Sequence, residues 1–318
     1  MLRIDDELSN VKRVAITGHI RPDGDCVGAT MALYNYIRDN YPEIEAKVLL
    51  EEPEAHFGFM RGFDEIVTAQ ASLGHFDLFV VLDVGELDRI AVFTHHYFKD
   101  ADRRICIDHH IKNAAIGDVN IIKPEISSAC EVLYEMLDEG KVSKETAECL
   151  YTGIIHDTGV FKYQSVTKRT MEIAGTLMEK GIDWTNIIDD TFFRKTFTQN
   201  ILMGKGLIDA KIALDGKVIY SYLPKSILEE YHVPGRDLGG IIDQLRFTKG
   251  IEIAIFAYGM ADKKIKVSLR SVNYANVNDI ATVFGGGGHA KAAGLTVETD
   301  NFDELLERIL AEAAKQLR

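Results

Sequence analysis

The chain has 318 residues, 46% of them hydrophobic and 27% charged, a composition that is ordinary for a folded protein and at this length favours about two domains. The formal net charge of −13 argues against a broad basic surface of the kind that long nucleic acids need, so an anionic substrate must be bound locally. No apolar run reaches the roughly 18 residues of a membrane span, and the first residues carry no apolar signal segment, so we expect a cytoplasmic protein without membrane contact.

The first half of the chain alternates short apolar runs with segments of helical periodicity, as expected of a parallel sheet covered by helices on both faces. A helix is predicted from Cys26 to about Asp39, because apolar residues recur there at helical spacing. The expected strands are residues 14–17, 46–50, 78–82 and 104–107. Polar residues follow each strand, so we expect them to share one edge of the sheet.

After residue 126 the pattern becomes helical, and Gly140 and Gly181 are candidate stop signals. The predicted helices are residues 127–138, 144–155 and 167–180, followed by a connecting helix at 191–207. The expected division is an N-terminal domain over residues 1–190, a linker over 191–209 and a C-terminal domain over 210–318.

The C-terminal third mixes strand and helix patterns. Its expected strands are residues 217–223, 251–260 and 264–271, and its expected helices are residues 237–247 and 301–317. Asp300 is a candidate N-cap for the last helix. The expected fold class is α/β, with a parallel-sheet N-terminal domain, a smaller mixed α/β C-terminal domain and an active-site cleft between them.

The loop after the first strand reads GHIRPDGDCVG over residues 18–28 and places His19, Asp23 and Asp25 close together. Further polar clusters are Asp83, the group Asp108, His109 and His110, and Asp157 in GIIHDTG. Ligands bind beyond the carboxyl ends of parallel strands, so the clusters that follow strands should converge in one crevice. Asp157 would join them from the end of a helix.

Several carboxylates brought together without compensation would repel one another and raise their pKa values. Divalent cations remove this conflict, and two imidazoles with four carboxylates suffice for two ions that share one bridging carboxylate, as in phosphoryl hydrolysis. A ligand set without thiolate favours Mn²⁺, with Mg²⁺, Co²⁺ and Fe²⁺ left open. A single aspartate at a strand end is more often a helix cap, so the prediction depends on the joint pattern. His95 and His96 lack an acidic partner after a strand and are expected to be surface residues.

A second motif is GGGGHAKAAG at residues 285–294. Consecutive glycines allow backbone amides to approach an anion, and His289 can add a donor. Arg270, in the segment SLRS, is a candidate for bidentate phosphate binding. A flexible hairpin for the glycines and an ordinary strand-end arginine are the alternatives, and the residues alone leave them open.

Cysteine spacing argues against two other kinds of site. Cys26, Cys106, Cys130 and Cys149 are far apart and form no CxxC pair, which disfavours a disulfide framework and a thiolate zinc site. We expect buried free thiols.

In this order, the opening His-Asp-Asp loop, Asp83, Asp108-His109-His110, GIIHDTG and GGGGHAKAAG resemble the DHH phosphoesterase family with its DHH-associated C-terminal domain. Within that family the chain is similar to the nanoRNase branch, whose members combine oligoribonuclease and pAp phosphatase activity. The resemblance covers nearly the whole chain.

The resemblance implies two Mn²⁺ ions, for which Mg²⁺ or Co²⁺ are conceivable substitutes. It places one ion on His19, Asp23 and Asp83, and a second on Asp25, Asp83, His109 and Asp157, with Asp83 as the bridge. His110 would then face the substrate phosphate, and Asp108 would orient the histidine pair. The residues implied to hold the phosphate or the terminal nucleotide are Arg270, Ser271, Gly286, Gly287, Gly288 and His289.

The predicted activity is hydrolysis of very short RNA oligonucleotides to nucleoside monophosphates and of pAp to AMP, by attack of water activated by the ions while His110 stabilises the transferred group. A RecJ-like exonuclease is disfavoured because no basic stripe is present, and a pyrophosphatase would leave GGGGH unused. Hydrolysis of cyclic di-AMP or pApA stays open. A non-catalytic nucleotide sensor also stays open, although every ligand position is filled. A homodimer is a possible assembly.

Overall fold

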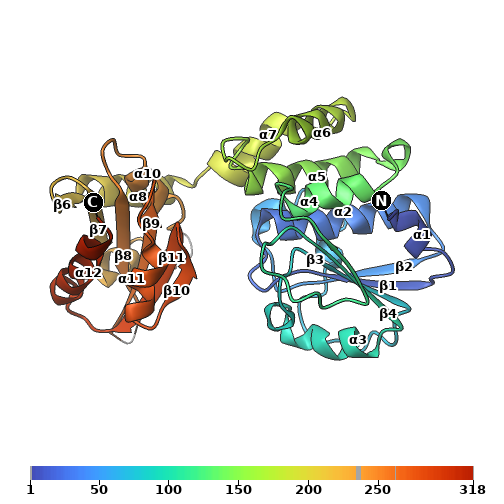
Figure 1. Cartoon of the computed structure of the whole chain (residues 1–318), viewed down its shortest axis with the longest axis horizontal. Helices are drawn as coiled ribbons and strands as arrows, with labels where there is room; N and C mark the ends of the chain where they lie inside the picture. The colour runs from blue at the N-terminus through green and yellow to red at the C-terminus, as the bar shows by residue number, and fades with distance from the viewer. Residues whose placement is uncertain (1, 234–237, 262, 318) are drawn as a thin grey trace. The chain divides into compact units, whose positions relative to one another are not determined.

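The structure is a computed structural model that describes residues 2–233, 238–261 and 263–317. The chain divides into two compact units, Met1–Arg194 and Lys195–Arg318, which are described separately (Figure 1). None of the helices in the described part of the chain combines the length and apolar character needed to cross a bilayer.

The first unit contains a five-stranded sheet in the order β2-β1-β3-β4-β5 in which every pairing is parallel, as the sequence predicts. Its strands are β1 Arg13–Thr17, β2 Glu45–Leu49, β3 Leu78–Leu82, β4 Arg103–Asp108 and β5 Val119–Ile122. The edge strand β5 was not predicted, because its four residues are only partly buried and lack a continuous apolar run.

Helices cover both faces of this sheet (Figure 1). The helices are α1 Ile4–Glu7, α2 Gly24–Asn40, α3 His95–Asp100, α4 Ala129–Met136, α5 Lys144–Asp157, α6 Lys168–Glu179 and α7 Trp184–Ile188. Short 3₁₀ turns occur at Ala55–Phe57, Phe63–Glu65, Leu87–Arg89, Val92–Thr94 and Glu139–Lys141, and a π-helical turn at Asp189–Phe193. A large apolar core lies where α2, α4 and α5 meet the sheet, and a smaller one lies under α3.

Two helix predictions differ from the structure. Helix α4 ends at Met136, before Gly140, which instead lies in a 3₁₀ turn. The single helix expected at 191–207 is interrupted, because Thr196 starts a new helix, α8 Phe197–Ile208, through a reciprocal cap with Gln199. The Thr196 hydroxyl accepts the Gln199 amide at 3.1 Å, and the Gln199 side chain accepts the Thr196 amide at 2.8 Å.

Two glycines allow α2 and α5 to approach closely. A Cβ at Gly28 would lie 2.6 Å from the Cys149 carbonyl oxygen, and a Cβ at Gly153 would overlap the Cys130 sulfur and lie 2.7 Å from Asp25 Oδ1. Because the helices touch at these positions, the end of α5 lies beside the start of α2. This contact brings Asp157 toward the opening loop.

The second unit contains a six-stranded mixed sheet in the order β10-β11-β9-β8-β7-β6, in which only the β7–β8 pairing is parallel among the described strands. Its strands are β6 Lys211–Ala213, β7 Val218–Leu223, β8 Ile253–Gly259, β9 Lys264–Ser271, β10 Gly287–His289 and β11 Ala292–Glu298. Its helices are α8, α9 Lys225–Glu230, α10 Ile241–Arg246, α11 Val277–Val283 and α12 Phe302–Gln316. An apolar core lies on each face of the sheet.

The mixed α/β architecture predicted for this unit is confirmed, with local differences. The helix expected at 237–247 is observed from Ile241, and residue 237 lies outside the described residues. The N-cap of α12 is Asn301 rather than Asp300, because the Asn301 side chain accepts the Glu304 amide at 3.2 Å. The glycine run forms the turn before β10 and the first residues of that strand. Strand β10 pairs with β11, which the sequence analysis missed.

Candidate functional site

The candidate residues of the first unit lie just beyond strand and helix ends. His19 follows β1, Asp83 follows β3, and Asp108 ends β4 with His109 and His110 after it. Asp23 caps α2, Asp25 lies in its first turn, and Asp157 is the last residue of α5. All of these side chains except Asp108 converge, in three overlapping groups, and within each group the candidate ligand atoms lie within 4.8 Å of one another.

The two aspartates of the opening loop point in different directions, and helix ends explain why. Asp23 Oδ1 accepts the amides of Asp25 and Cys26, each at 3.1 Å, as an N-cap does. The buried Asp25 carboxylate instead accepts the amides of Ala129 at 2.6 Å and Cys130 at 3.0 Å, at the start of α4. The loop therefore supplies one carboxylate to each of two neighbouring groups.

The first group consists of His19, Asp23 and Asp83. His19 Nε2 lies 3.5 Å from Asp23 Oδ1 and 3.4 Å from Asp83 Oδ2. The other ring nitrogen, Nδ1, lies 2.9 Å from the Ile20 carbonyl oxygen and can donate its proton there. Nε2 therefore faces the two carboxylates, and it is the ring nitrogen from which His19 could bind a cation once its proton is displaced.

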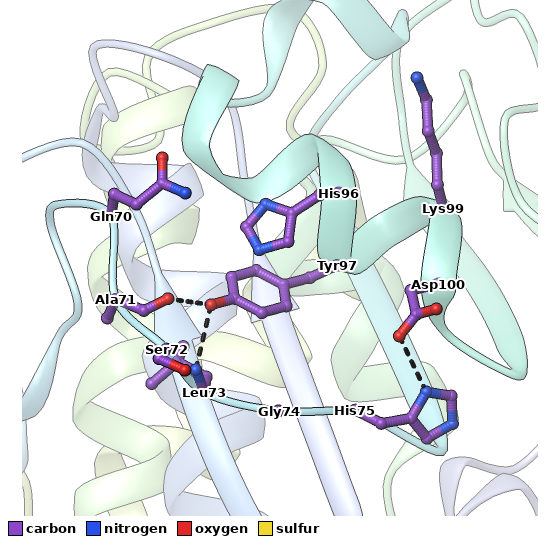
Figure 2. Close-up of a pocket in the computed structure, with 10 residues that line it drawn as sticks. All are labelled: Gln70, Ala71, Ser72, Leu73, Gly74, His75, His96, Tyr97, Lys99 and Asp100. Atoms are coloured by element: carbon purple, nitrogen blue, oxygen red, sulfur yellow. Dashed lines mark hydrogen bonds and ion pairs between the residues drawn. The ribbon is translucent and has the colours of Figure 1, made fainter.

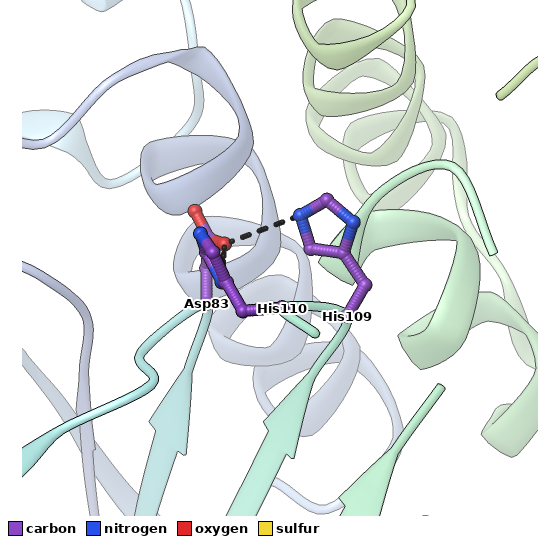
Figure 3. A group of neighbouring side chains, drawn as sticks. All are labelled: Asp83, His109 and His110. Carbon is purple, nitrogen blue, oxygen red and sulfur yellow. Dashed lines mark ion pairs between the residues drawn. The ribbon is translucent and has the colours of Figure 1, made fainter. Parts of the chain in front are cut away.

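The second group consists of Asp25, His109 and Asp157. His109 Nε2 lies 3.0 Å from Asp157 Oδ2 and 3.8 Å from Asp25 Oδ2. It also lies 3.6 Å from Asp83 Oδ1, and Figure 3 shows the Asp83 carboxylate directed at the His109 ring. Asp83 thus contributes one oxygen toward each group.

Asp83 is the most constrained residue of the site. It is 3% exposed and has a positive φ of 60°, a conformation that is strained for an aspartate, while its amide donates to the Ile107 carbonyl oxygen at 3.0 Å. Within the described structure, Asp83 Oδ1 is buried without a hydrogen-bond partner. The imidazole nitrogens of His109 and His110 lie 3.6 Å from this oxygen, too far for a hydrogen bond, so a buried carboxylate oxygen at this position fits a cation.

The pKa values show how the charges of the site depend on one another. Burial, with the charges of Asp83 and Asp157, raises the pKa of Asp25 well above its ordinary value, and burial raises the pKa of Asp83 to about 6. Burial alone would lower the pKa of His19 and that of His109, but hydrogen bonds to the neighbouring carboxylates raise these pKa values to about 11 and about 10. The carboxylates thus depend on positive charge nearby, and divalent cations supply such charge.

His110 belongs to a third group, with Asp83 and His109, and also pairs with Asp108. His110 Nδ1 lies 2.7 Å from Oδ1 of the buried Asp108, and this hydrogen bond raises the pKa of His110. Asp108 Oδ2 accepts Nδ2 of Asn113 at 2.5 Å, and Asn113 also donates to the Val84 carbonyl oxygen at 3.1 Å. The pair fixes the His110 ring and leaves its Nε2 for another partner.

Sequence reasoning missed Asn113 and His156. Asn113 lies in a loop, where a single asparagine gives no distinguishing signal. His156 packs its ring over Gly24, so that a Cβ at residue 24 would overlap the ring. Close packing against His156 therefore requires glycine at position 24. The sequence alone could not show that these two residues are neighbours.

In the second unit, the candidate substrate-binding residues lie on β9, β10 and the turn before β10. Arg270 is partly buried, with Nε 3.9 Å from Asp243 Oδ1 and Nη1 donating to the Leu269 carbonyl oxygen at 3.1 Å. Ser271 is buried and its hydroxyl donates to the Ala290 carbonyl oxygen at 3.4 Å, next to the exposed His289. Ser271 thus holds the hairpin, and its contact with substrate stays a prediction.

The glycines of the run do different things. A Cβ at Gly286 would lie 2.6 Å from Leu295 Cβ, and a Cβ at Gly288, where φ is 151°, would lie 2.7 Å from Ala293 Cα. A Cβ at Gly287 would meet no atom closer than 3.9 Å. Packing in the hairpin therefore explains Gly286 and Gly288 but leaves Gly287 unexplained. The hairpin alternative raised for this run is the conformation observed.

A pocket of about 900 Å³ lies elsewhere in the first unit and contains none of the candidate residues (Figure 2). It is lined by the loop of residues 70–75 and by α3, where the Tyr97 hydroxyl donates to the Ala71 carbonyl oxygen. Nearby His75 pairs with Asp100 and Asp102, each at 3.1 Å, so its acidic neighbours are already compensated.

His95 is partly buried and His96 is exposed. All four cysteines are buried and free, as predicted.

Comparisons with known proteins agree with this geometry. The DHH family N-terminal domain matches residues 13–154, and the DHHA1 domain matches residues 215–315. The chain is 26% identical to the bifunctional oligoribonuclease and PAP phosphatase NrnA of Thermus thermophilus, over 96% of this chain and 90% of that protein. It is 27% identical to the protein of the same name from Bacillus subtilis, over 92% and 91% of the two chains.

The fold comparison gives the same result. The crystal structure of an exopolyphosphatase-related protein from Bacteroides fragilis matches with a TM-score of 0.90 at 26% identity, covering 98% of this chain and 95% of that chain. The two family domains fall in the two units, and the motifs that resemble the family carry the converging side chains. The chain belongs to the DHH family of phosphoesterases and carries a DHHA1 domain in its second unit.

Proposed function

We propose that this protein is a phosphohydrolase with two Mn²⁺ ions that degrades very short oligoribonucleotides to nucleoside monophosphates and dephosphorylates pAp to AMP. The observation that carries the proposal is the pair of carboxylate and imidazole groups that share Asp83. The names of the relatives from Thermus thermophilus and Bacillus subtilis support the substrate class.

The donor set fits two divalent ions. His19, Asp23 and Asp83 would hold one ion, and Asp25, Asp83, His109 and Asp157 would hold the other. The buried Asp83 Oδ1, which has no hydrogen-bond partner in the described structure, and the two Nε2 atoms that face carboxylates support this assignment. Mixed oxygen and nitrogen donors without thiolate suit Mn²⁺, and also Mg²⁺ or Co²⁺. When bound, the ions would lower the pKa of water and neutralise charge on the phosphoryl oxygens.

The residues around the ions would orient the substrate and move protons. The hydrogen bond from Nδ1 to Asp108 favours protonated His110, whose Nε2–H can donate to a phosphoryl oxygen as negative charge develops there. Asp108 acts through His110 and is a positioning residue. Its buried carboxylate is itself fixed by Asn113, which reduces the freedom of the ring.

The second unit carries its own candidate groups for binding phosphate or a terminal nucleotide. Arg270 offers a planar fork of donors to a phosphate, and His289 and the amides of the run Gly286–Gly288 are close in sequence on the exposed hairpin. Ser271 would support this surface through the hairpin backbone. A local phosphate site suits short substrates, since a chain of net charge −13 offers little attraction to long nucleic acid.

Activity after metal exchange tests the proposal. The protein is treated with a chelator, reloaded with Mn²⁺, Mg²⁺ or Co²⁺, and assayed on pAp, pApA, a ribotrinucleotide, a longer RNA oligomer and cyclic di-AMP. We expect turnover only after reloading, highest on pAp and the shortest RNAs. Rates that rise with oligomer length would remove the short-RNA assignment, and preference for cyclic di-AMP would assign the alternative phosphodiesterase activity. Negligible turnover of every substrate, and of bis-p-nitrophenyl phosphate, with and without metal would indicate a nucleotide sensor.

A further inference from the structure

A row of aromatic rings leads away from the candidate metal centre within the first unit. The Phe57 and His156 ring centroids are 5.4 Å apart, those of His156 and Phe192 are 5.7 Å apart, and those of Phe192 and Phe193 are 5.4 Å apart. The exposed fraction increases along this row, from 2% at Phe57 to 36% at Phe192 and 59% at Phe193. The outer end of the row is therefore open to solvent.

His156, the second ring of the row, packs against the backbone of residues that would hold metal. His156 directly precedes Asp157 at the end of α5, and its ring fills the space where Gly24 lacks a side chain. Gly24 lies between Asp23 and Asp25 in sequence, so the ring lies against the backbone that carries both carboxylates. Within the described residues, His156 Nε2 is buried without a hydrogen-bond partner.

The backbone under the outer rings is unusual. Phe192 and Phe193 end the π-helical turn Asp189–Phe193, a conformation that is rare and occurs frequently at functional sites. Arg194 stabilises its end, since its amide donates to the Asp189 carbonyl oxygen at 2.6 Å and its guanidinium pairs with Asp190. A fixed turn thus presents two large apolar rings to solvent beside a cluster of charged groups, where folding alone gives no reason to expose them.

We propose that Phe192 and Phe193 form a stacking surface for a nucleobase of the substrate, next to the metal centre. This inference rests on the proposed function, because it assumes that a nucleotide phosphate is bound at the ions. Aromatic rings bind every base through its π-face, so stacking fits an enzyme that accepts short RNAs of any sequence. The base would cover the exposed part of Phe193, and the ribose would then lie between the rings and the ions.

The test distinguishes the contribution of the base to turnover from that of the phosphates. Two substrates are compared: pAp, and ribose 3,5-bisphosphate, which keeps both phosphates but has no base. For Phe193→Ala we expect kcat/KM on pAp to fall about 5- to 150-fold, the range set by loss of one stacked base, while kcat/KM on ribose 3,5-bisphosphate stays within about twofold. Phe193→Trp, which retains an aromatic face, should keep most of the activity on pAp.

A matched control is Met171→Ala, which removes an apolar side chain that is 50% exposed on α6 and should leave both substrates unaffected. Equal losses on both substrates in Phe193→Ala would overturn the inference and indicate a structural role. Unchanged activity on both would overturn it as well, and would suggest that the rings meet another protein surface. If the metal-loaded wild-type protein hydrolyses neither pAp nor a ribodinucleotide, the proposed function itself fails, which is a distinct result.

Discussion

In the first unit the candidate ligands lie around the buried Asp25 and Asp83 and are fixed by one another and by helix ends, whereas in the second unit His289 and Gly287 lie exposed on an edge strand. Asp25 is an example, because its carboxylate accepts two amides at the start of α4 and lies 3.8 Å from His109 Nε2. The glycine hairpin is held through its backbone and the buried Ser271.

The difference suggests how each region responds to change. In the first unit the charged groups compensate one another, so removing one leaves its partners unbalanced in a buried place. In the second unit the exposed groups can be removed without leaving a buried charge. We therefore expect abrupt losses at the metal centre and graded losses at the hairpin, and the following experiments test this contrast.

Asp83→Asn should have the largest effect. The amide is similar in size, but it cannot bridge two cations, so metal-dependent turnover of pAp should fall by at least about 10³-fold. Calorimetric titration with Mn²⁺ should show weakened binding, while circular dichroism should report an unchanged fold. Retention of near wild-type activity would contradict the bridging role of Asp83.

Gly153→Ala should disturb the same centre through its contact with Asp25. The added methyl group would press on the Cys130 sulfur and on Asp25 Oδ1, so we expect a loss of about 2–3 kcal/mol in the free energy of unfolding, with reduced activity. The control is Gly175→Ala on α6, where a Cβ meets no atom within 4 Å and a small gain in stability is expected. If both variants were equally stable, the close contact between α2 and α5 would not matter.

Arg270→Ala tests the graded response of the second unit. We expect the KM for pAp to rise about tenfold, with kcat within about threefold of the wild-type value, because a phosphate contact is lost while the metal centre is intact. Lys266→Ala, on the same face of β9, is the control. A collapse of kcat with unchanged KM would instead place Arg270 in the chemical step.

The hairpin glycines can be separated from one another. Gly288→Ala should destabilise the second unit by about 1–3 kcal/mol, because φ is 151° and the backbone of β11 blocks a side chain. Gly287→Ala should leave thermal unfolding unchanged, since its Cβ would have space. A rise in KM in Gly287→Ala would therefore report close approach of the substrate. Equal stability losses in both variants would show that the run is needed for folding alone.

Much of the fold could be predicted because apolar runs and helical periodicity dominate it. The strand at 78–82 was predicted with its observed bounds, and the order of polar clusters indicated which ends would meet. The weak strands β5 and β11 were missed, since β5 is only partly buried and β11 contains Ala and Gly. The π-helical turn was not foreseen either, because no periodicity distinguishes it.

In the candidate site, residue types and their order predicted which side chains would lie together, but not the contacts that orient them. Asp23 lies near His19 and Asp25 lies near His109, which is the proximity that the predicted ligand sets require. The reasons for it lie in tertiary contacts: the amides of α4 direct Asp25, and His156 requires Gly24. Such contacts join distant segments, so a single sequence cannot reveal them.

The smallest effect is expected at a charged cluster that, unlike the metal centre, is balanced by protein groups alone. Asp5 accepts hydrogen bonds from Lys141 at 3.0 Å, Tyr36 at 2.9 Å and Tyr41. Burial would raise the pKa of Asp5, but these hydrogen bonds hold it below the ordinary value. The stabilisation is therefore present above the unfolded-state pKa of about 4 and is lost as pH falls through the folded-state pKa.

Asp5→Asn should lower the free energy of unfolding by about 1–2 kcal/mol at pH 7, and the difference from wild type should shrink below about pH 4. Turnover should be unaffected, because no ion or substrate needs this carboxylate. The exposed Asp64→Asn serves as the control in urea unfolding at both pH values. A pH-independent difference would show that packing, rather than charge, stabilises this cluster. A loss of activity would mean that the cluster around Asp5 and the candidate metal centre respond alike. The difference in how their charges are balanced would then not explain the activity.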